Sequence, residues 1–282
     1  MGWLSYALLA VASYSVFYIL TRVFLKEKSS DAIAYTIVFN FVCALLISLV
    51  SLKNGFILPD IKHYYLNFGL MAVLYTASQV LIFKASRTIG ASDLIIFSST
   101  RVLWVIGAAL LFLGEAFNTP KIIGTILILI SVVYVSAKKK GIKLNKGHIY
   151  ALLAAFCIGI GFVNDSYILR NADTISYAAL AFIFPAVLTL IVFPSSTLKL
   201  KYYLNLGILT KILLLGVFYS IGLVASYLSY KAGGNASQIV PIGQSVVIIT
   251  VILAALFLGE RENVSKKIIA AILVSIGVLL LR

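Results

Sequence analysis

One arginine, Arg101, lies in the middle of a long apolar run. If residues 91–113 form a helix, Arg101 lies about 15 Å from its start, at a rise of about 1.5 Å per residue. Burial at that depth in a membrane costs at least about 2.5–3.5 kcal/mol, and the side chain is too short to reach an interface. Because a guanidinium binds carboxylates and phosphates bidentately, Arg101 is a candidate anchor for an anionic ligand. The alternative is a structural arginine that neutralises a buried carboxylate or caps helix carbonyls.

Asp165 is a carboxylate inside an apolar run, late in residues 147–169. If successive runs alternate in direction, Asp165 lies roughly 12 Å deeper than Arg101 along the same axis. A pair bridged by water or ligand is therefore favoured over a direct one, and an interfacial Asp165 is a further alternative. The remaining carboxylates near these runs lie at run ends: Asp93, Glu115 and Glu260. Export of lipophilic cations needs a buried carboxylate, for which Asp165 is the only candidate.

Uncharged polar and aromatic side chains inside the runs are candidates to line a substrate cavity: Gln79, Ser99, Trp104, Tyr227, Gln244 and Ser245, with Asn40, Tyr75, Tyr219 and Ser226 as further members. For each polar group the alternative is a hydrogen bond between helices, worth about 0.6 kcal/mol on average. Trp104 would stack on a ligand or face lipid or the core. Pro241 frees a helix carbonyl and bends its segment, which predicts a hinge or a packing bend.

Membrane-spanning helices are the elements that must position these side chains. The 282 residues are 62% hydrophobic and 11% charged with a mean hydropathy of +1.08, whereas soluble domains are about 45–50% apolar and about 25% charged. Crossing the hydrocarbon takes about 20 residues, and runs of that size lie at 3–25, 32–52, 63–85, 91–113, 121–137, 147–169, 175–193, 206–231, 235–258 and 266–281. Without two-residue alternation they predict helices. We expect an all-α membrane protein with ten transmembrane helices, the first retained rather than cleaved.

An internal repeat divides the chain in two. The sequence Phe-Leu-Gly-Glu occupies residues 112–115 and recurs at 257–260, and residues 6–10 recur at 150–154, at offsets of 145 and 144. We predict a first repeat at 1–137, a basic linker at 138–146 and a second repeat at 147–282. Five runs per half make the second half enter the membrane from the opposite side, which gives inverted repeats around a midplane site. Ser99 and Gln244 are then equivalent positions.

This pattern resembles the EamA-type family of the drug/metabolite transporter superfamily. The residues that carry the resemblance are Leu-Gly-Glu at 113–115 with Gly124, Leu-Gly-Glu-Arg at 258–261 with Gly277, and 233–237 leading into 240–244. Asp165 and Tyr167 lie where some members carry an aspartate in helix six. Gly114-Glu115 and Gly259-Glu260 are interpreted as helix-end chemistry, with glycine ending one helix and glutamate complementing the dipole of the next.

The resemblance implies a transporter built as a basket of ten helices. Helices three, four, eight and nine would line a central cavity, one, two, six and seven would lie opposite or beside them, and five and ten would be peripheral. Members export amino acids, metabolites or sugars, so no substrate is implied. The first half departs from the family because Ile96 lies where Pro241 lies in the second half, and the packing of residues 91–113 is expected to differ.

Charge distribution leaves the orientation open. The net charge of +14 comes from lysines and arginines in short gaps between apolar runs, which is typical of membrane loops and not of a nucleic-acid surface. Sixteen of the 23 lie in odd-numbered loops, which the positive-inside rule places in the cytoplasm with both termini outside. The family resemblance implies cytoplasmic termini. Both interpretations put the two termini on the same side.

No catalytic constellation accompanies these features. Cys43 and Cys157 lie in apolar runs, His63 and His148 begin runs as expected interfacial anchors, and no nucleotide-binding loop is present. We expect no enzyme activity, metal, cofactor or nucleic-acid partner. The sequence predicts a multi-pass secondary transporter of the cell (inner) membrane, exporting a small polar or anionic metabolite such as an amino acid. The alternative is a non-transporting binding, sensor or lipid-handling scaffold with the same fold; the oligomeric state is left open.

Overall fold

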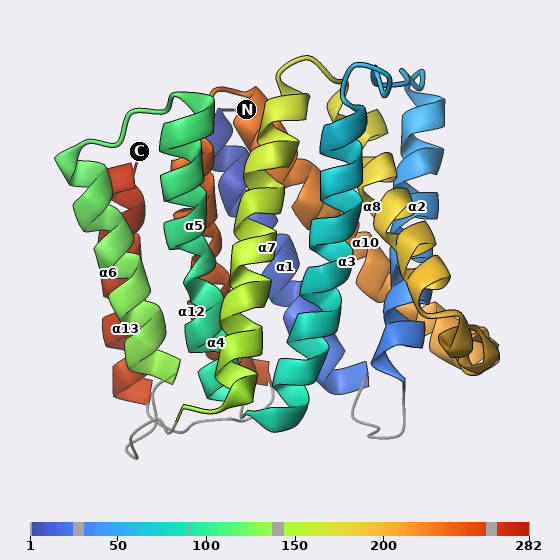
Figure 1. Cartoon of the computed structure of the whole chain (residues 1–282). Helices are drawn as coiled ribbons and strands as arrows, with labels where there is room; N and C mark the ends of the chain where they lie inside the picture. The colour runs from blue at the N-terminus through green and yellow to red at the C-terminus, as the bar shows by residue number, and fades with distance from the viewer. Residues whose placement is uncertain (1, 25–30, 90, 137–143, 258–263, 282) are drawn as a thin grey trace.

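A computed structural model describes residues 2–24, 31–89, 91–136, 144–257 and 264–281, and this part of the chain is helical with no strand (Figure 1). The elements are α1 Trp3–Phe24, α2 Ala32–Lys53, α3 Tyr65–Thr88, α4 Ala91–Ser99, α5 Arg101–Ala108, the π-helical turn η1 Ala109–Leu113, α6 Thr119–Ser136, α7 Lys146–Leu169, α8 Thr174–Val192, the 3₁₀-helix η2 Pro194–Lys199, α9 Leu200–Tyr203, α10 Leu206–Lys231, α11 Ala236–Gly243, α12 Ser245–Phe257 and α13 Val264–Leu281.

Each apolar run of the sequence is helical in the described residues, and this confirms the all-helical membrane class. Runs 91–113 and 235–258 are not single helices, because each is divided into shorter pieces. Seven stretches are long and apolar enough to cross a membrane: Trp3–Thr21, Ile33–Lys53, Tyr65–Thr88, Ile96–Leu113, Lys146–Leu169, Thr174–Val192 and Leu206–Lys231. The apolar stretches of α6, of α11 with α12, and of α13 are shorter. The ten-helix inverted repeat therefore stays a prediction.

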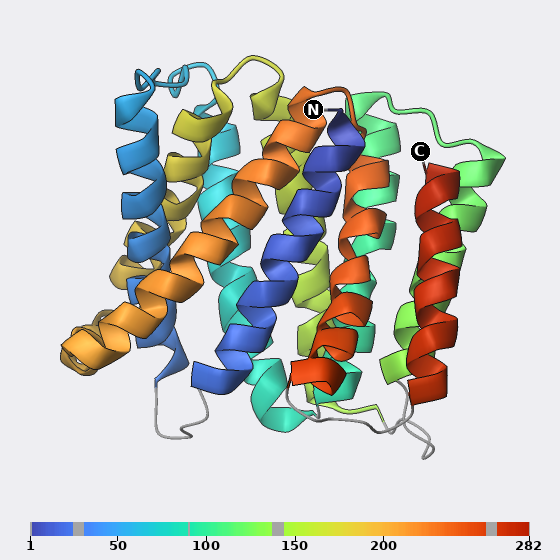
Figure 2. The same ribbon diagram turned by 180° about the vertical axis from the view of Figure 1, so that it is seen from behind.

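The helices stand side by side in two layers. The front layer of Figure 1 runs from α6 through α4 and α5, then α7 and α3, to α8. The view from behind shows the back layer, which runs from α13 through α12, α1 and α10 to α2 (Figure 2). The most extensive contacts join α3 with α7, α1 with α10, α2 with α8 and α6 with α13. The pair α6 and α13 lies at one edge of the molecule, as the family resemblance implies for helices five and ten.

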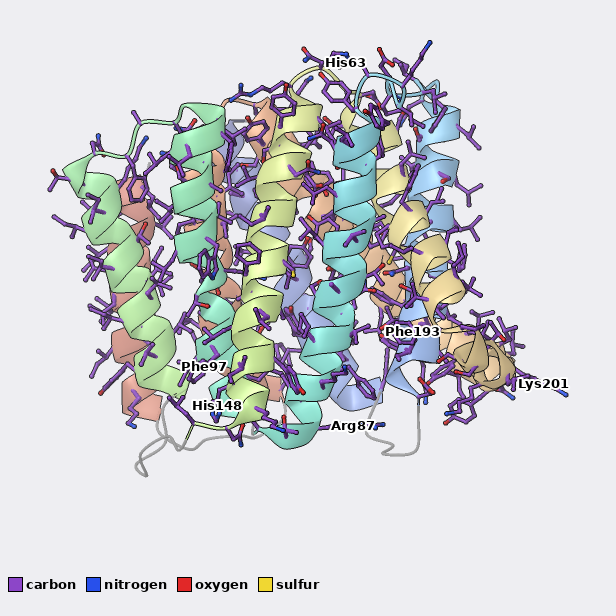
Figure 3. All side chains as sticks on the ribbon, in the orientation of Figure 1. His63, Arg87, Phe97, His148, Phe193 and Lys201 are labelled. Carbon is purple, nitrogen blue, oxygen red and sulfur yellow. The ribbon has the colours of Figure 1, made fainter. Side chains whose placement is uncertain are left out.

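Both chain termini lie at the same end of the molecule (Figures 1 and 2). His63 lies at that end, whereas Arg87, His148 and Lys201 lie at the other (Figure 3). Arg87 and Lys201, two described basic residues of odd-numbered loops, thus lie opposite the termini (Figure 3). His148 closes a capping box at the start of α7, where its Nδ1 accepts from the backbone N–H of Asn145 at 2.9 Å.

Two glycines bring the edge helices α6 and α13 into backbone contact. A Cβ on Gly124 would lie 2.7 Å from the carbonyl oxygen of Gly277, and a Cβ on Gly277 would lie 2.8 Å from the carbonyl oxygen of Gly124. Small residues permit such close approach in membranes, where dispersion between backbones contributes to helix association. The two glycines that accompany Leu-Gly-Glu in the sequence therefore have a packing role.

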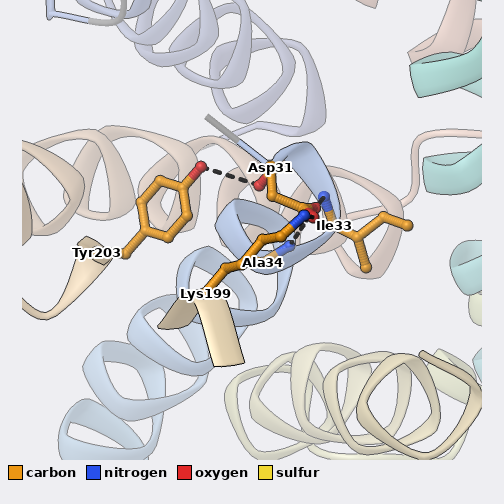
Figure 4. Close-up of polar contacts among 5 residues, drawn as sticks. All are labelled: Asp31, Ile33, Ala34, Lys199 and Tyr203. Atoms are coloured by element: carbon orange, nitrogen blue, oxygen red, sulfur yellow. Dashed lines mark hydrogen bonds and ion pairs between the residues drawn. The ribbon is translucent and has the colours of Figure 1, made fainter. Parts of the chain in front are cut away.

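The segment before α10 is fastened to the start of α2 (Figure 4). Asp31 Oδ1 accepts from the backbone N–H groups of Ile33 at 2.9 Å and Ala34 at 3.2 Å, and Oδ2 accepts from Lys199 Nζ at 2.8 Å. The Tyr203 hydroxyl donates to the Asp31 carbonyl oxygen at 2.9 Å. This contact joins η2 and α9, neither of which the sequence predicted, to a membrane-spanning helix.

The charge on Asp31 is expected to make part of the stability pH-dependent. Partial burial raises the pKa of Asp31, but hydrogen bonds from Lys199, Ala34 and Ile33 outweigh burial and hold the pKa below its usual 3.8. A lowered folded-state pKa stabilises the fold above the unfolded value, and this contribution is lost as the pH falls through the lowered value. Asp31→Asn keeps the cap and removes the charge, so it should cost no more than about 1 kcal/mol at neutral pH.

Thermal unfolding of the wild type and Asp31→Asn across pH checks this. The midpoints should differ at neutral pH and converge below about pH 4. A difference that persists at acid pH would show that the carboxylate charge is not the cause. The expected effect is small because 63% of the Lys199 side chain is exposed, and solvent screens the ion pair.

Candidate substrate-binding site

Two helix breaks lie at matched positions in the two halves of the sequence. The first is Thr100, between α4 and α5, with φ −62° and ψ −13°; the second is Gln244, between α11 and α12, with φ −66° and ψ −20°. At each break the chain tightens to i−3 hydrogen bonds: Thr100 to Phe97 at 3.2 Å, Leu103 to Thr100 at 2.9 Å, Gln244 to Pro241 at 2.9 Å and Val247 to Gln244 at 3.0 Å. These bonds repeat at an offset of 144, one of the two repeat offsets of the sequence. Such breaks inside spans often mark functional positions.

Proline is not the common cause of the breaks. Pro241 is buried and precedes the break in the second half by three residues, whereas Phe97 precedes the first break by three residues and Ile96, its match at the offset of 145, by four. The sequence predicted that residues 91–113 differ from the second half because they lack this proline. At the break itself the two halves do not differ. A difference appears later, where η1 ends this run as a π-helical turn and the matching described part of α12 stays α-helical. Pro241 as a hinge remains a prediction.

The two breaks meet through Arg101 and Gln244. With its amide oxygen facing the guanidinium, Gln244 accepts from Arg101 Nε at 2.8 Å and from Nη2 at 3.2 Å. This contact joins the front layer to the back layer. No described carboxylate lies within 4.0 Å of the guanidinium, whose positive charge is thus met by a neutral amide. Arg101 has five N–H donors in total, so donors remain for a ligand.

Two serines accompany the breaks. Ser245 follows Gln244 directly, is 3% exposed and has no hydrogen-bond partner for its hydroxyl among the described residues. A buried hydroxyl without a partner costs about 1–3 kcal/mol, so it is a site where a bound polar group gains a contact. Ser99 ends α4 just before the first break and is also buried.

Asp165 is caged by three tyrosines. Its Oδ2 accepts from the hydroxyls of Tyr75 and Tyr227, each at 2.5 Å, and its Oδ1 accepts from the Tyr177 hydroxyl at 2.7 Å. The carboxylate is 0% exposed, so the interfacial alternative for Asp165 is wrong. The direct pair with Arg101 is also absent among the described contacts. The cage joins α7 to α3, α8 and α10.

Gln79 and Trp104 take part in other contacts. Gln79 of α3 and Asn40 of α2 exchange amide hydrogen bonds of 3.3 and 3.4 Å, which is the interhelical alternative considered for such groups. Trp104 is 43% exposed and meets Phe156 of α7 edge-on, with ring centroids 5.1 Å apart. The structure thus brings together Arg101 with Gln244 and Asp165 with Tyr227. It does not place Gln79 or Trp104 in either of these two contacts.

Glu115 caps a helix of the other half. Gly114 ends η1 in the left-handed conformation with φ +67°, as expected for a helix-ending glycine. The carboxylate of Glu115 then accepts from the backbone N–H groups of Ala236 at 2.7 Å and Ser237 at 2.9 Å, and from the Ser237 hydroxyl at 2.5 Å. The interpretation of Glu115 as dipole complement of the next helix is therefore corrected, because the helix it caps is α11. The second copy, Gly259-Glu260, lies outside the described residues.

Removal of this cap should weaken the contact between the layers. Glu115→Ala leaves three donors at the start of α11 without their acceptor, and loss of a helix N-terminal cap costs about 0.5–2 kcal/mol. We expect a loss of about 2 kcal/mol in the free energy of unfolding. Ser237→Ala, which removes only the hydroxyl, should lose less. Equal stability of Glu115→Ala and the wild type in detergent would contradict the cap.

Broken helices around a buried polar centre, in a bundle of long apolar helices, define a polytopic membrane protein of transporter type. The model of the EamA-like transporter family matches residues 1–137 and 145–282. The chain belongs to this family, whose members are membrane transporters of the drug/metabolite transporter superfamily. One solved crystal structure, described only as that of a protein, is similar with a TM-score of 0.78 and 12% identity over 99% of this chain and 95% of the other. This likeness shows the fold alone, and no curated protein matches the sequence.

Proposed function

We propose that this transporter moves a small polar or anionic metabolite, such as an amino acid, by alternating access between two inverted five-helix halves at 1–137 and 147–282, joined by the linker at 138–146. The contacts support this. If each helix is replaced by its counterpart in the other half, α3 becomes α10 and α7 becomes α1. The contacting pair α3 and α7 then corresponds to the contacting pair α10 and α1, and the pair α5 and α7 corresponds to α12 and α1. The pairs α2 with α8 and α6 with α13 map onto themselves. Similar halves of opposite direction can exchange roles, so a central site opens to either side at similar free energy.

The observation that carries the choice of substrate is the uncompensated charge of Arg101 at the paired breaks. A guanidinium at membrane depth whose side-chain hydrogen-bond partner among the described residues is a neutral amide favours an anionic ligand and repels cations. Gln244 contacts the guanidinium, and Ser245 and Ser99, which adjoin the two breaks in the chain, are the proposed uncharged contacts for the rest of a small metabolite. Export across the cell (inner) membrane completes the proposal, with coupling to a gradient or to counter-substrate exchange.

A thermal-shift screen tests the binding step. Detergent-purified wild type and Arg101→Leu would be compared with amino acids, organic acids, sugar phosphates and lipophilic cations. A ligand of the folded state raises the unfolding midpoint by mass action. We expect an anion to stabilise the wild type and not the variant. Stabilisation by cations alone, or equal stabilisation of both proteins by an anion, would overturn Arg101 as the anchor.

A further inference from the structure

The aspartate cage holds a negative charge that the proposed anion site does not use. Asp165 lies within the span Lys146–Leu169, is fully buried and has no described cation within ion-pair distance. Such groups inside membranes are expensive and mark ion or proton pathways. The question is which partner balances this charge during a transport cycle.

Three cations on α7 and on helices packed against it, Lys231, Arg170 and Arg101, donate to neutral acceptors. Lys231 of α10 donates to the carbonyl oxygens of Leu169 at 3.0 Å and of Arg170 and Ala172 at 3.3 Å. Arg170 donates to the carbonyl oxygen of Leu113 at 2.6 Å and to the Tyr230 hydroxyl at 3.2 Å. Arg101 of α5 donates to Gln244. The groups that face the carboxylate from α3, α8 and α10 are the phenols of Tyr75, Tyr177 and Tyr227.

The three phenol donors match the ionised form of Asp165 better than the protonated form. An ionised carboxylate only accepts, and three phenol donors suit it. A protonated Oδ2 would bring its own hydrogen toward the two hydroxyl hydrogens of Tyr75 and Tyr227 that already point at that oxygen. At least one of these phenols must then rotate its hydroxyl hydrogen away from Oδ2 or break its hydrogen bond to the carboxyl group. If that phenol leaves, its helix, α3 or α10, loses a hydrogen bond to α7, and the cage then couples the charge on Asp165 to the packing of helices.

Tyr75 is the least buried of the three tyrosines, and the access route proposed below begins at it. Tyr177 and Tyr227 are fully buried, whereas Tyr75 keeps part of its surface exposed. Its ring lies against Gly161, where a Cβ would come within 3.1 Å of the ring, so this glycine admits the tyrosine to α7. A water molecule that reaches Tyr75 is one phenol away from the carboxylate. At the neighbouring position of α7, Asn164 accepts a hydrogen bond from the Asn67 side chain at 2.7 Å, a second polar contact between α7 and α3.

We propose that Asp165 is the proton-binding group that couples solute movement to a proton gradient, an inference that rests on the proposed transport function. In this scheme the caged Asp165 of the structure corresponds to the ionised form, which three phenol donors suit. When the cage opens on one side, a proton from water forms an O–H bond with the carboxylate, whose charge goes from −1 to zero, and one phenol leaves. When the other side opens, that O–H bond breaks, the proton passes to water and the three phenols close again.

Infrared difference spectroscopy of the purified protein tests proton binding without any solute. Acidification should produce a carbonyl band of a protonated carboxylic acid in the wild type. Asp165→Asn should lack this band, and the matched control Asp60→Asn, which changes an exposed aspartate, should retain it. Tyr75→Phe removes one donor that stabilises the ionised form, so the band should appear about one pH unit higher. No acid-induced band, or the same band in Asp165→Asn, would overturn the proposal.

Reconstituted vesicles separate this inference from the transport function. With the anion found in the thermal-shift screen, the wild type should accumulate solute under an imposed pH gradient. Asp165→Asn should lose this accumulation and keep solute exchange at equal pH. Gradient-driven accumulation that survives in Asp165→Asn would refute the coupling and leave transport intact. If no anion binds the wild type, the proposed transport function is refuted. The infrared measurement then still shows whether Asp165 binds a proton.

Discussion

Arg101→Leu is expected to reduce transport of the anionic solute by roughly 100-fold while the helical fold persists. Two charge-assisted hydrogen bonds from one guanidinium contribute about 3 kcal/mol together, and each 1.4 kcal/mol is a factor of ten. The folded protein should tolerate the change because leucine at this depth avoids the cost of burying a charge. The unpaired Gln244 amide offsets part of that gain. Solute uptake into vesicles, with helical content and elution volume as fold controls, measures the effect.

Arg101→Lys separates the effect of the positive charge from that of the guanidinium shape. A lysine keeps the charge and loses the planar fork that reaches a carboxylate through two bonds, so transport should fall by an intermediate factor of roughly ten. Gln244→Leu removes the amide that holds the guanidinium in place, and it should weaken apparent affinity more than maximal rate. Transport that is unchanged in Arg101→Leu would show that the arginine is structural.

Gly124→Leu is expected to have the largest effect on stability. The new side chain would meet the Gly277 carbonyl oxygen, and backbone cannot move aside as a flexible side chain does. Overpacking typically costs about 1–3 kcal/mol, and here it also separates α6 from α13, so we expect a loss of about 3 kcal/mol or more. The matched control is Gly69→Leu on α3, where a Cβ would meet nothing within 4 Å.

The comparison of these two variants isolates the contact, because both replace a helical glycine with leucine. Helix propensity alone favours leucine over glycine by up to about 1 kcal/mol, so Gly69→Leu should be neutral or stabilising. Thermal unfolding in one detergent measures both. Equal midpoints for Gly124→Leu and Gly69→Leu would refute close backbone packing between α6 and α13.

The sequence predicted the class of the fold and both residues of the central contact, Arg101 and Gln244, but not the bond between them. Arg101 stands out because charge at membrane depth is costly, and Gln244 stands out because the repeat offset places it opposite Ser99. The direct bond between them was not predictable. It requires both runs to break, and only the second half carries a proline near the break. Backbone tightening at Thr100 has no residue signature in the first half.

The aspartate cage shows a second limit of the sequence. Depth estimates along the helices disfavoured a direct pair of Asp165 with Arg101, and none is present among the described contacts, but such estimates carry no information on rotation about the helix axis. Tyr75 and Tyr177 lie in other runs, and nothing in their spacing indicates that both phenols face Asp165. Glu115 shows the same limit, because a helix-end glutamate can cap any helix start within reach. Its partner α11 is distant in sequence and near only in the folded chain.

Solute flux in sealed vesicles measures directly whether the protein transports an anion that Arg101 binds. Purified protein would be reconstituted, the vesicles loaded with the unlabelled anion that stabilises it, and entry of the labelled anion followed over time. We expect the labelled anion to enter faster than in protein-free vesicles, at a rate that saturates with its concentration. Vesicles with Arg101→Leu should lose this entry. Stabilisation by the anion without any protein-dependent entry would contradict the account, and the chain would then be a non-transporting binding protein that keeps the transporter fold.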